Sequence, residues 1–208
     1  MNSRTTAILV LIPFTALTAM AIVSDGTNGF PAAITYSLTS LQIWVDLVIA
    51  MLFWCAWVIR DAKASGRNGL PWVIAALLFG AFAPLLYMVA YQRGFASPGE
   101  APTAGDASRR RLTATIVIFA FAALTIAALW VDGTDIPGAV MRTWSNVQIW
   151  VDLVIIIVMW LAWLIKDARQ HGNNPWGWVV FALVLGAFSP LLYTAVHGRW
   201  PASHPASS

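Results

Sequence analysis

The sequence predicts an all-α integral membrane protein with six transmembrane helices, arranged as a 3+3 inverted repeat. Two observations carry this prediction: the composition and an internal repetition. Hydrophobic residues make up 59% of the chain and charged residues only 10%, against roughly 45–50% and about 25% in ordinary globular domains. So little charge cannot cover a surface that faces water, and the apolar side chains must therefore face lipid as well as one another. The composition excludes a soluble domain.

Six apolar runs are long enough to cross about 30 Å of hydrocarbon at about 1.5 Å per residue. They cover residues 5–23, 41–60, 71–91, 112–131, 147–166 and 176–197. The first run follows Arg4 and has the look of a signal peptide, but the matching run at 112–131 lies inside the chain. Because an internal run cannot be a cleaved signal, we expect the first run to be a retained helix as well.

The second half of the chain repeats the first at an offset of 106 residues. Residues 42–49 recur letter for letter as 148–155, and 28 of the 52 positions from 42 to 93 are identical to their partners. The matches include Asp, Asn, Gly, Pro and Trp, which chance pairing of apolar residues would not align, so we infer a duplication. The predicted organisation is a first three-helix repeat at 1–94, a linker at 95–111, a second repeat at 112–200 and a disordered tail at 201–208.

Three crossings per copy would insert the second copy upside down relative to the first, as in inverted-repeat transporters. With the N-terminus inside, the 12 basic residues then divide evenly between the two sides. The inner segments hold Arg4, Arg60, Lys63, Arg67, Arg142 and Arg199, and the outer segments hold Arg93, Arg109, Arg110, Arg111, Lys166 and Arg169. The positive-inside rule therefore leaves the orientation undecided. We expect a multi-pass protein of the bacterial inner membrane.

Two repeated helices each place a glutamine, an aspartate and a tryptophan within a stripe of about 100°. The residues are Gln42, Asp46 and Trp57 in the first copy and Gln148, Asp152 and Trp163 in the second. An acid near the bilayer centre costs about 2.5–3.5 kcal/mol, so we expect both stripes to face the bundle interior, where the acids form a proton or cation site. The alternative is an acid near the headgroups, stabilised by the dipole of its own helix. A helix that starts at Ser40 favours this alternative, whereas a start at Pro31 places the acid deeper.

The third and sixth apolar runs each carry an alanine, a glycine and a proline four residues apart. They are Ala76, Gly80 and Pro84, and then Ala182, Gly186 and Pro190. Small residues at this spacing let two helices approach closely, and a mid-helix proline frees the carbonyl four residues earlier, which is that of the glycine. The freed carbonyl is either a ligand for a cation or polar substrate or part of a packing kink that a neighbour satisfies. Both glycines belong to the candidate binding site. Two charged pairs, Arg60-Asp61 and Lys166-Asp167, are expected to be solvated helix ends.

No motif in the chain indicates catalysis. The sequence has no HExxH, P-loop, GxSxG or glycine-rich dinucleotide motif, and its one cysteine, Cys55, leaves no metal-binding spacing. His171 and His204 lie outside the apolar runs and His197 ends one, so no buried pair is available for haem. We therefore predict no catalytic residues, metal ligands or cofactor. The basic residues occupy short connecting segments and form no nucleic-acid footprint. The expected partners are the lipid bilayer and a second copy or a larger membrane complex.

The repeated residues resemble a family of short bacterial membrane proteins of unknown function, the domain-of-unknown-function family 2834, here as two tandem copies. The resemblance rests on Asp46, Trp54, Trp57, Arg60-Asp61, Gly66, Trp72, Gly80, Pro84-Leu85-Leu86-Tyr87 and Arg93. It implies a three-helix unit with an early Asp-Leu, a basic loop that ends in glycine and a Pro-Leu third helix. The family has no settled activity, so the resemblance implies no catalytic residues.

Two functions are compatible with these patterns. The first is a transporter or channel for a small solute or ion, with its path at the interface between the repeats, which the paired acids and prolines favour. The alternative is a non-enzymatic accessory or scaffolding subunit that binds a lipid, quinone or carotenoid within a larger membrane complex. The abundance of tryptophan, 12 residues, favours the alternative.

Overall fold

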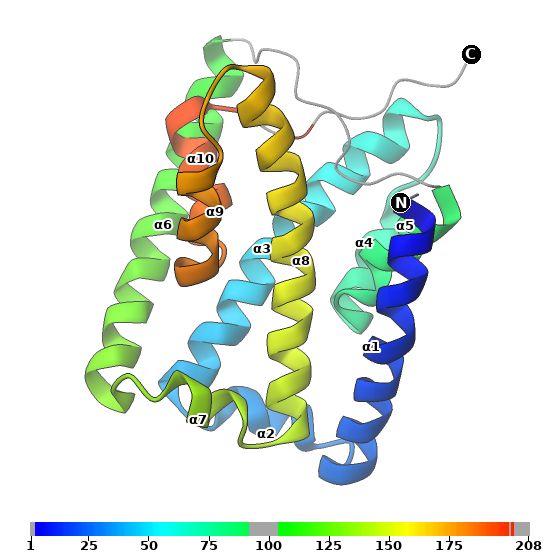
Figure 1. Cartoon of the computed structure of the whole chain (residues 1–208), viewed down its shortest axis with the longest axis vertical. Coiled ribbons are helices and arrows are strands. Elements are labelled where there is room, and N and C mark those ends of the chain that lie inside the picture. Colours follow the sequence, from blue (N-terminus) through cyan, green and yellow to red (C-terminus); the bar gives the residue numbers. More distant parts are fainter. Residues whose placement is uncertain (1–2, 92–103, 200, 202–208) are drawn as a thin grey trace.

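A computed structural model describes residues 3–91, 104–199 and 201, and within these ranges all regular secondary structure is helical. The first half contains α1 (Ser3–Asp25), α2 (Gly29–Thr35), α3 (Leu38–Ala64), α4 (Leu70–Phe79) and α5 (Phe82–Tyr91), and the second half contains α6 (Ala104–Asp132), α7 (Ile136–Val140), α8 (Trp144–Gln170), α9 (Trp176–Leu185) and α10 (Phe188–His197) (Figure 1). Four of these helices, α1, α3, α6 and α8, are long and apolar enough to cross a membrane. The chain is a multi-pass membrane protein.

The third and sixth apolar runs each form two short helices that fold back on each other. Each of these helices has 10 residues and is about 15 Å long. The rings of Trp72, near the start of α4, and Tyr91, at the end of α5, lie 5.7 Å apart, and those of Trp178 and His197 lie 6.0 Å apart. A continuous helix would separate either pair by about 28 Å. Each run is therefore a hairpin that enters and leaves at the same end of the molecule, and the prediction of six transmembrane helices is wrong (Figure 1).

A glycine at each hairpin tip explains the reversal. Gly80 and Gly186 have φ angles of +56° and +55°, a conformation that side chains with a Cβ rarely adopt. Pro84 and Pro190 are each the third residue of the second short helix, where a helix needs no N–H from that residue. The glycine carbonyls were predicted to be free, but both accept a hydrogen bond. That of Gly80 accepts the N–H of Ala83 and that of Gly186 accepts the N–H of Ser189, both at 3.3 Å. The prolines start new helices instead of kinking continuous ones.

The two halves of the chain have the same orientation. Figure 1 shows α1 and α6 running away from the end that carries the N-terminus, and α3 and α8 running back toward it. With two crossings and one hairpin per half, the chain returns to its starting side before α6 begins. The inverted arrangement is therefore also wrong, because it depended on three crossings per half.

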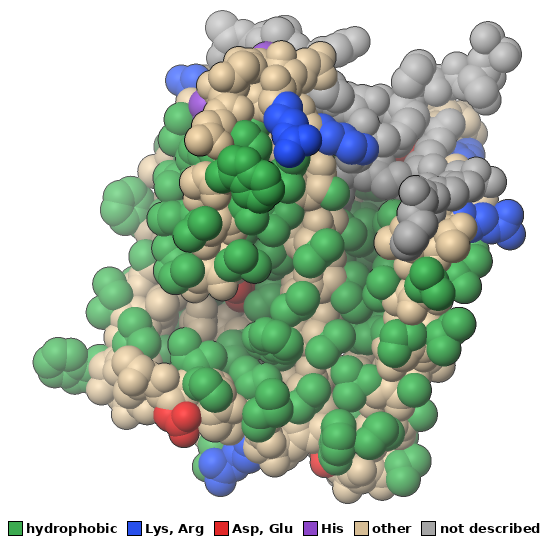
Figure 2. Space-filling model, viewed as in Figure 1, with side chains coloured by type: hydrophobic (Ala, Val, Ile, Leu, Met, Phe, Trp, Pro, Cys, Tyr) green, Lys and Arg blue, Asp and Glu red, His purple; other side chains and the backbone are tan. Residues whose placement is uncertain are grey.

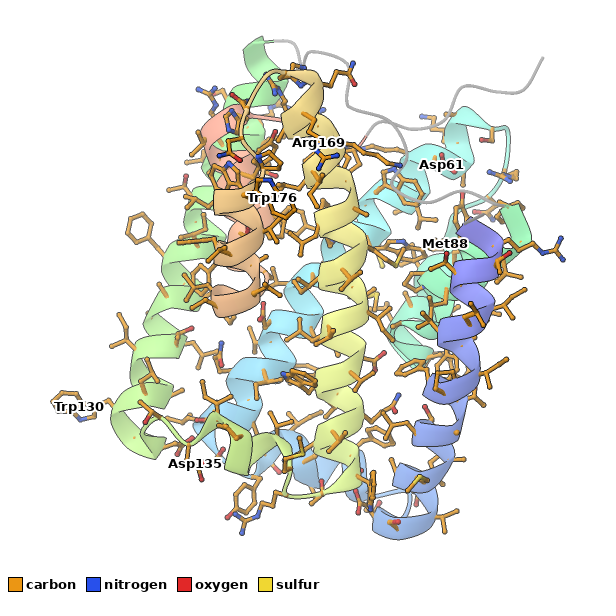
Figure 3. All side chains as sticks on the ribbon, in the orientation of Figure 1. Asp61, Met88, Trp130, Asp135, Arg169 and Trp176 are labelled. Carbon is orange, nitrogen blue, oxygen red and sulfur yellow. The ribbon has the colours of Figure 1, made fainter. Side chains whose placement is uncertain are left out.

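This orientation gathers the positive charge at one end of the molecule. Of the 11 basic residues in the described part of the chain, 10 lie at the end where α1 and α6 begin, and only Arg142 lies at the other. These 10 residues, which define the basic end, are Arg4, Arg60, Lys63, Arg67, Arg109, Arg110, Arg111, Lys166, Arg169 and Arg199. Figure 2 shows the same separation of blue side chains, and Figure 3 places Arg169 at this end and Asp135 at the other. The even division of charge predicted from six crossings does not occur.

The halves interlock in space. The central helices α3 and α8 contact each other, while α1 packs on α8 and α6 packs on α3. Each first helix also caps the other half, because Asp25 Oδ2 accepts the N–H of Ser145 and Asp132 Oδ2 accepts that of Thr39, both at 2.6 Å. The first helix of each predicted unit, 1–94 or 112–200, therefore packs against the central helix of the other. Within the expected linker, α6 already begins at Ala104, whereas residues 95–103 and the tail 202–208 lie outside the described residues.

We expect the loops that follow α3 and α8 to be on the same side of the membrane. In a Cys55→Ala background, cysteines at Ala64 and Gln170, which are exposed positions at the ends of α3 and α8, should react with an impermeant maleimide in vesicles of the same sidedness. A cysteine at Thr134, in the connection between α6 and α7, should react only in vesicles of the opposite sidedness. Labelling of positions 64 and 170 from opposite sides would restore the inverted repeat.

Candidate functional site

The two intrahelical aspartates are buried well inside their helices. The helix α3 begins at Leu38, and the side chain of Ser37 caps it by accepting the N–H of Ser40. Asp46 is therefore about 12 Å from the start of α3, beyond the first turn over which a helix dipole acts. Asp46 and Asp152 are 5% and 9% exposed. Neither of the predicted helix starts is correct, and stabilisation by the dipole of their own helices does not account for these acids.

Each aspartate instead holds the hairpin tip of the other half. Asp46 Oδ1 accepts the N–H of Ala187 at 3.0 Å, and Asp152 Oδ1 accepts the N–H of Ala81 at 2.7 Å. Both alanines immediately precede the second helix of a hairpin. The unpaired N–H groups at a helix N-terminus carry partial positive charge and stabilise a nearby carboxylate. This bond provides a partner for an acid that would otherwise be unfavourable inside a membrane.

The predicted glycines lie against the predicted aspartates, but across the two halves. A Cβ placed on Gly80 would lie 2.7 Å from Asp152 Oδ2, and a Cβ on Gly186 would overlap Asp46 Oδ2. The hairpin tip can therefore approach the carboxylate only if it carries no side chain. The structure thus brings the aspartate of each half next to the glycine of the other half, a pairing that the sequence patterns did not predict.

A cavity of about 550 Å³ lies between the tip of the α9–α10 hairpin and α7. A hairpin about 15 Å deep fills only half of a hydrocarbon layer of about 30 Å, which leaves space beneath its tip. The polar side chains on the cavity wall are those of Thr39, Gln42, Asp46, Thr125 and Trp150, and the rest of the lining is apolar. This volume is within the range of about 300–1,000 Å³ that is usual for small-molecule sites.

The cavity opens sideways onto the lipid-facing surface. Three of its lining residues, Leu183, Val184 and Val158, are 76%, 74% and 57% exposed. Figure 2 shows a hollow on this face, surrounded by hydrophobic side chains, with an acidic side chain visible inside it. A molecule dissolved in the bilayer could therefore reach Asp46 without first crossing water.

The remaining predicted site residues lie away from this cavity. Trp57 and Trp163 are fully buried and make edge contacts with the rings of Tyr87 and Tyr193, at 5.8 and 5.6 Å. Gln148 is 3% exposed, and its Oε1 has no hydrogen-bond partner among the described residues. Of the eight predicted residues, Gln42, Asp46 and Gly186 line the cavity, Gly80 and Asp152 meet at the other tip, and the other three are buried elsewhere.

Side chains fill the interface between α3 and α8, where the solute path was predicted. Ile156 and Trp160 are 0% and 1% exposed, and Trp160 Nε1 donates to the carbonyl of Ala50 at 3.4 Å. Asp152 is not among the residues that line the cavity at Asp46. The two acids therefore do not face a common cavity in this structure.

Sequence reasoning missed a second pair of buried acids at the basic end. Asp61 and Asp167 are 0% exposed, so the prediction of solvated helix ends is wrong for them. The hydroxyl of Tyr87 donates to Asp61 Oδ2 at 2.5 Å, and that of Tyr193 donates to Asp167 Oδ2 at 2.6 Å. Both pairs are 26 residues apart, and this repeated spacing was the available signal. Each aspartate and its tyrosine meet only because the intervening apolar run folds back as a hairpin.

Basic side chains lie close to both acids among the described residues. Arg67 lies 3.5 Å from Asp61 Oδ2, whereas Arg199 lies 3.4 Å from Asp167 Oδ2 and His171 lies 3.7 Å from its Oδ1. The tyrosine bonds join α5 and α10 to the ends of the preceding long helices, whereas Arg67 and His171 lie in the connections directly after α3 and α8.

Among the described residues, no three His, Cys, Asp or Glu side chains gather as a metal site would require. Comparisons of the chain with protein-family models, with curated proteins and with solved structures found no match. The interpretation of the site therefore rests on its geometry.

Proposed function

We propose that the protein binds an amphipathic small molecule, which enters from the bilayer into the cavity beneath the α9–α10 hairpin. The cavity itself is the observation that carries this proposal, because its walls are apolar and open to lipid while Thr39, Gln42 and Asp46 offer polar groups along one face of α3. A molecule with an apolar body and one polar group matches this arrangement. This is the binding or scaffolding role, with a lipid or a quinone as the kind of ligand that has this shape.

A transport function is the second candidate, and the attachment of both acids to hairpin tips favours it. Binding or loss of a proton or cation at Asp46 or Asp152 would change the strength of the bond to Ala187 or Ala81 and so the position of the tip. Movement of a hairpin would open a path that the filled α3–α8 interface does not provide. Proton- or cation-coupled uptake into vesicles, lost in Asp46→Asn and Asp152→Asn, is the expected result for this candidate.

We further propose that the basic end faces the cytoplasm of a bacterial cell and that the protein lies in the inner membrane. The distribution of basic residues, 10 at one end and one at the other in the described chain, supports this orientation through the positive-inside rule. Membership of the family of short bacterial membrane proteins, and assembly as a homodimer or within a larger complex, are retained as proposals.

Filling the mouth of the cavity should remove the ligand. Val158 lines the cavity and is 57% exposed, while Leu52 occupies the corresponding position of α3 and is 53% exposed. We expect the amount of lipid or quinone that co-purifies with the protein to be at least tenfold lower for Val158→Trp than for the wild type. Mass spectrometry of gently solubilised protein measures this amount. Leu52→Trp, the matched control, should retain it. Equal retention by both variants would contradict binding in this cavity.

A further inference from the structure

We infer that the ligand of this cavity is an amphipathic organic cation, held by the carboxylate of Asp46. The inference rests on the proposed binding function and identifies the ligand class. It starts from the surroundings of that carboxylate. Asp46 Oδ1 accepts one backbone N–H, that of Ala187, and Asp46 forms no ion pair with a basic side chain in the described part of the chain.

None of the described basic residues forms an ion pair with this acid. Ten of those described are at the basic end, and Arg142, at the opposite end, lies over the ring of Tyr36 at 3.7 Å. None of the described residues that line the cavity is a lysine, arginine or histidine. The N-terminus of the α10 helix supplies only about half a positive charge. A full carboxylate charge in the cavity therefore lacks a full counter-charge.

A cationic ligand supplies that counter-charge where it has the greatest effect. Attraction between opposite charges is several times stronger at the low effective dielectric of a membrane interior than in water, and an unpaired acid there is strongly unfavourable. Gln42 and Thr39 add oxygen acceptors for an ammonium group on the same face of α3, and the indole of Trp150 on the wall favours cations. The other lining side chains accommodate an apolar body.

Binding of such a cation is coupled to the release of a proton from Asp46. In this scheme a proton on Asp46 Oδ2 neutralises the acid while the cavity is empty, and Oδ1 accepts the N–H of Ala187. An entering cation displaces that proton, which passes to the surrounding water, and a carboxylate–cation pair forms. One positive charge enters for each that leaves, so the total charge of the site does not change. A neutral amphiphile would instead bind without releasing a proton.

The other half of the chain offers a matched control. Asp152 makes the same type of bond to a hairpin tip, through Ala81, but the described cavity does not reach it. The asparagine at either position retains a side-chain oxygen that can accept the N–H of the tip. Asp46→Asn and Asp152→Asn therefore perturb the fold similarly and differ in their effect on the cavity.

The test measures binding of tetraphenylphosphonium, a lipophilic cation, and of triphenylphosphine oxide, a neutral probe, to the full chain in phosphatidylcholine nanodiscs by calorimetry. We expect the wild type and Asp152→Asn to bind the cation with the same affinity and to release about one proton, detected as a dependence of the heat on the buffer. Asp46→Asn should bind the cation at least tenfold more weakly without proton release. Val158→Trp should bind neither probe.

The possible results separate this inference from the function on which it rests. Binding of both probes with equal affinity by the wild type, without proton release, would overturn the cationic ligand and leave an amphiphile site in place. Equal cation affinity of Asp46→Asn and the wild type would overturn it as well. Unchanged binding in Val158→Trp would overturn the site itself. The comparison of the two probes on the wild type decides the matter even if Asp46→Asn does not fold.

Discussion

Replacement of Gly186 by alanine is expected to lower the free energy of unfolding by about 2–6 kcal/mol. The Cβ would overlap the carboxylate of Asp46, and the φ angle of +55° is unfavourable for any residue with a side chain. The backbone conformation, with φ +55° and ψ −129°, accounts for about 1–3 kcal/mol, and loss of the buried bond between Asp46 and Ala187 for about 1–3 kcal/mol. Gly80→Ala should have a similar effect through Asp152. Denaturant titration in mixed micelles measures both.

Two other glycines with positive φ serve as comparisons in which an added Cβ makes no contact. Gly66 and Gly172 have φ angles of +67° and +70°, but a Cβ on either would meet no atom within 4 Å. Their alanine variants should lose only the backbone contribution of about 1–2 kcal/mol. Leu78→Ala, at a position 69% exposed, should also have a small effect. If Gly186→Ala were no less stable than Gly172→Ala, the contact between the tip and Asp46 would be absent from the folded protein.

Removal of the acid at the basic end should destabilise the protein by about 3–5 kcal/mol in Asp61→Ala and in Asp167→Ala. Each variant leaves a tyrosine hydroxyl and a partly buried arginine without their carboxylate, and truncation of one member of a buried pair has this cost. Thermal melting and denaturant titration of the purified variants provide the measurement. Tyr193→Phe, which removes one hydrogen bond from Asp167, should cost about 1–3 kcal/mol.

The neighbouring basic residues provide the comparison for these acids. Lys63 and Arg169 are exposed and lie two residues after Asp61 and Asp167, so their alanine variants should change stability by less than about 0.5 kcal/mol. Equal stability of Asp61→Ala and Lys63→Ala would show that the carboxylate is solvated, as the sequence had suggested. The comparison also tests the hairpin directly, because Tyr87 reaches Asp61 only if α5 folds back along α4.

Sequence repetition and helical periodicity predicted some residues of the candidate site but not their contacts. Repetition identified Asp46 and Gly186 separately, and periodicity correctly placed Gln42 on the same face of α3 as Asp46. The contact between Asp46 and the hairpin tip, 141 residues away, could not be predicted because periodicity reveals which residues share a face and not which helix that face meets. The same limit explains Trp57, whose position in the stripe was right but whose neighbour is Tyr87.

The prediction of the membrane topology was wrong for a different reason. A run of about 20 apolar residues satisfies one crossing of the hydrocarbon or two half crossings equally well, because hydrophobicity measures length along the chain and not direction. The direction of residues 71–91 depends on the reversed backbone of Gly80 and on Pro84 as the start of a helix. The same basic residues then divide evenly between two sides or gather at one end, according to that single conformational choice.

The sequence by itself determined that this is a helical, multi-pass membrane protein, where its six apolar runs lie, and which residues of its two halves correspond. These properties follow from composition and from local spacing, since burial in lipid depends on how many apolar residues stand in a row. Only the tertiary structure decided that two of the six runs are hairpins, that both halves have the same orientation, and that Asp46 lies at a cavity open to lipid. These features arise from two glycine backbones with positive φ and from hydrogen bonds between the halves, which join residues that no local pattern connects.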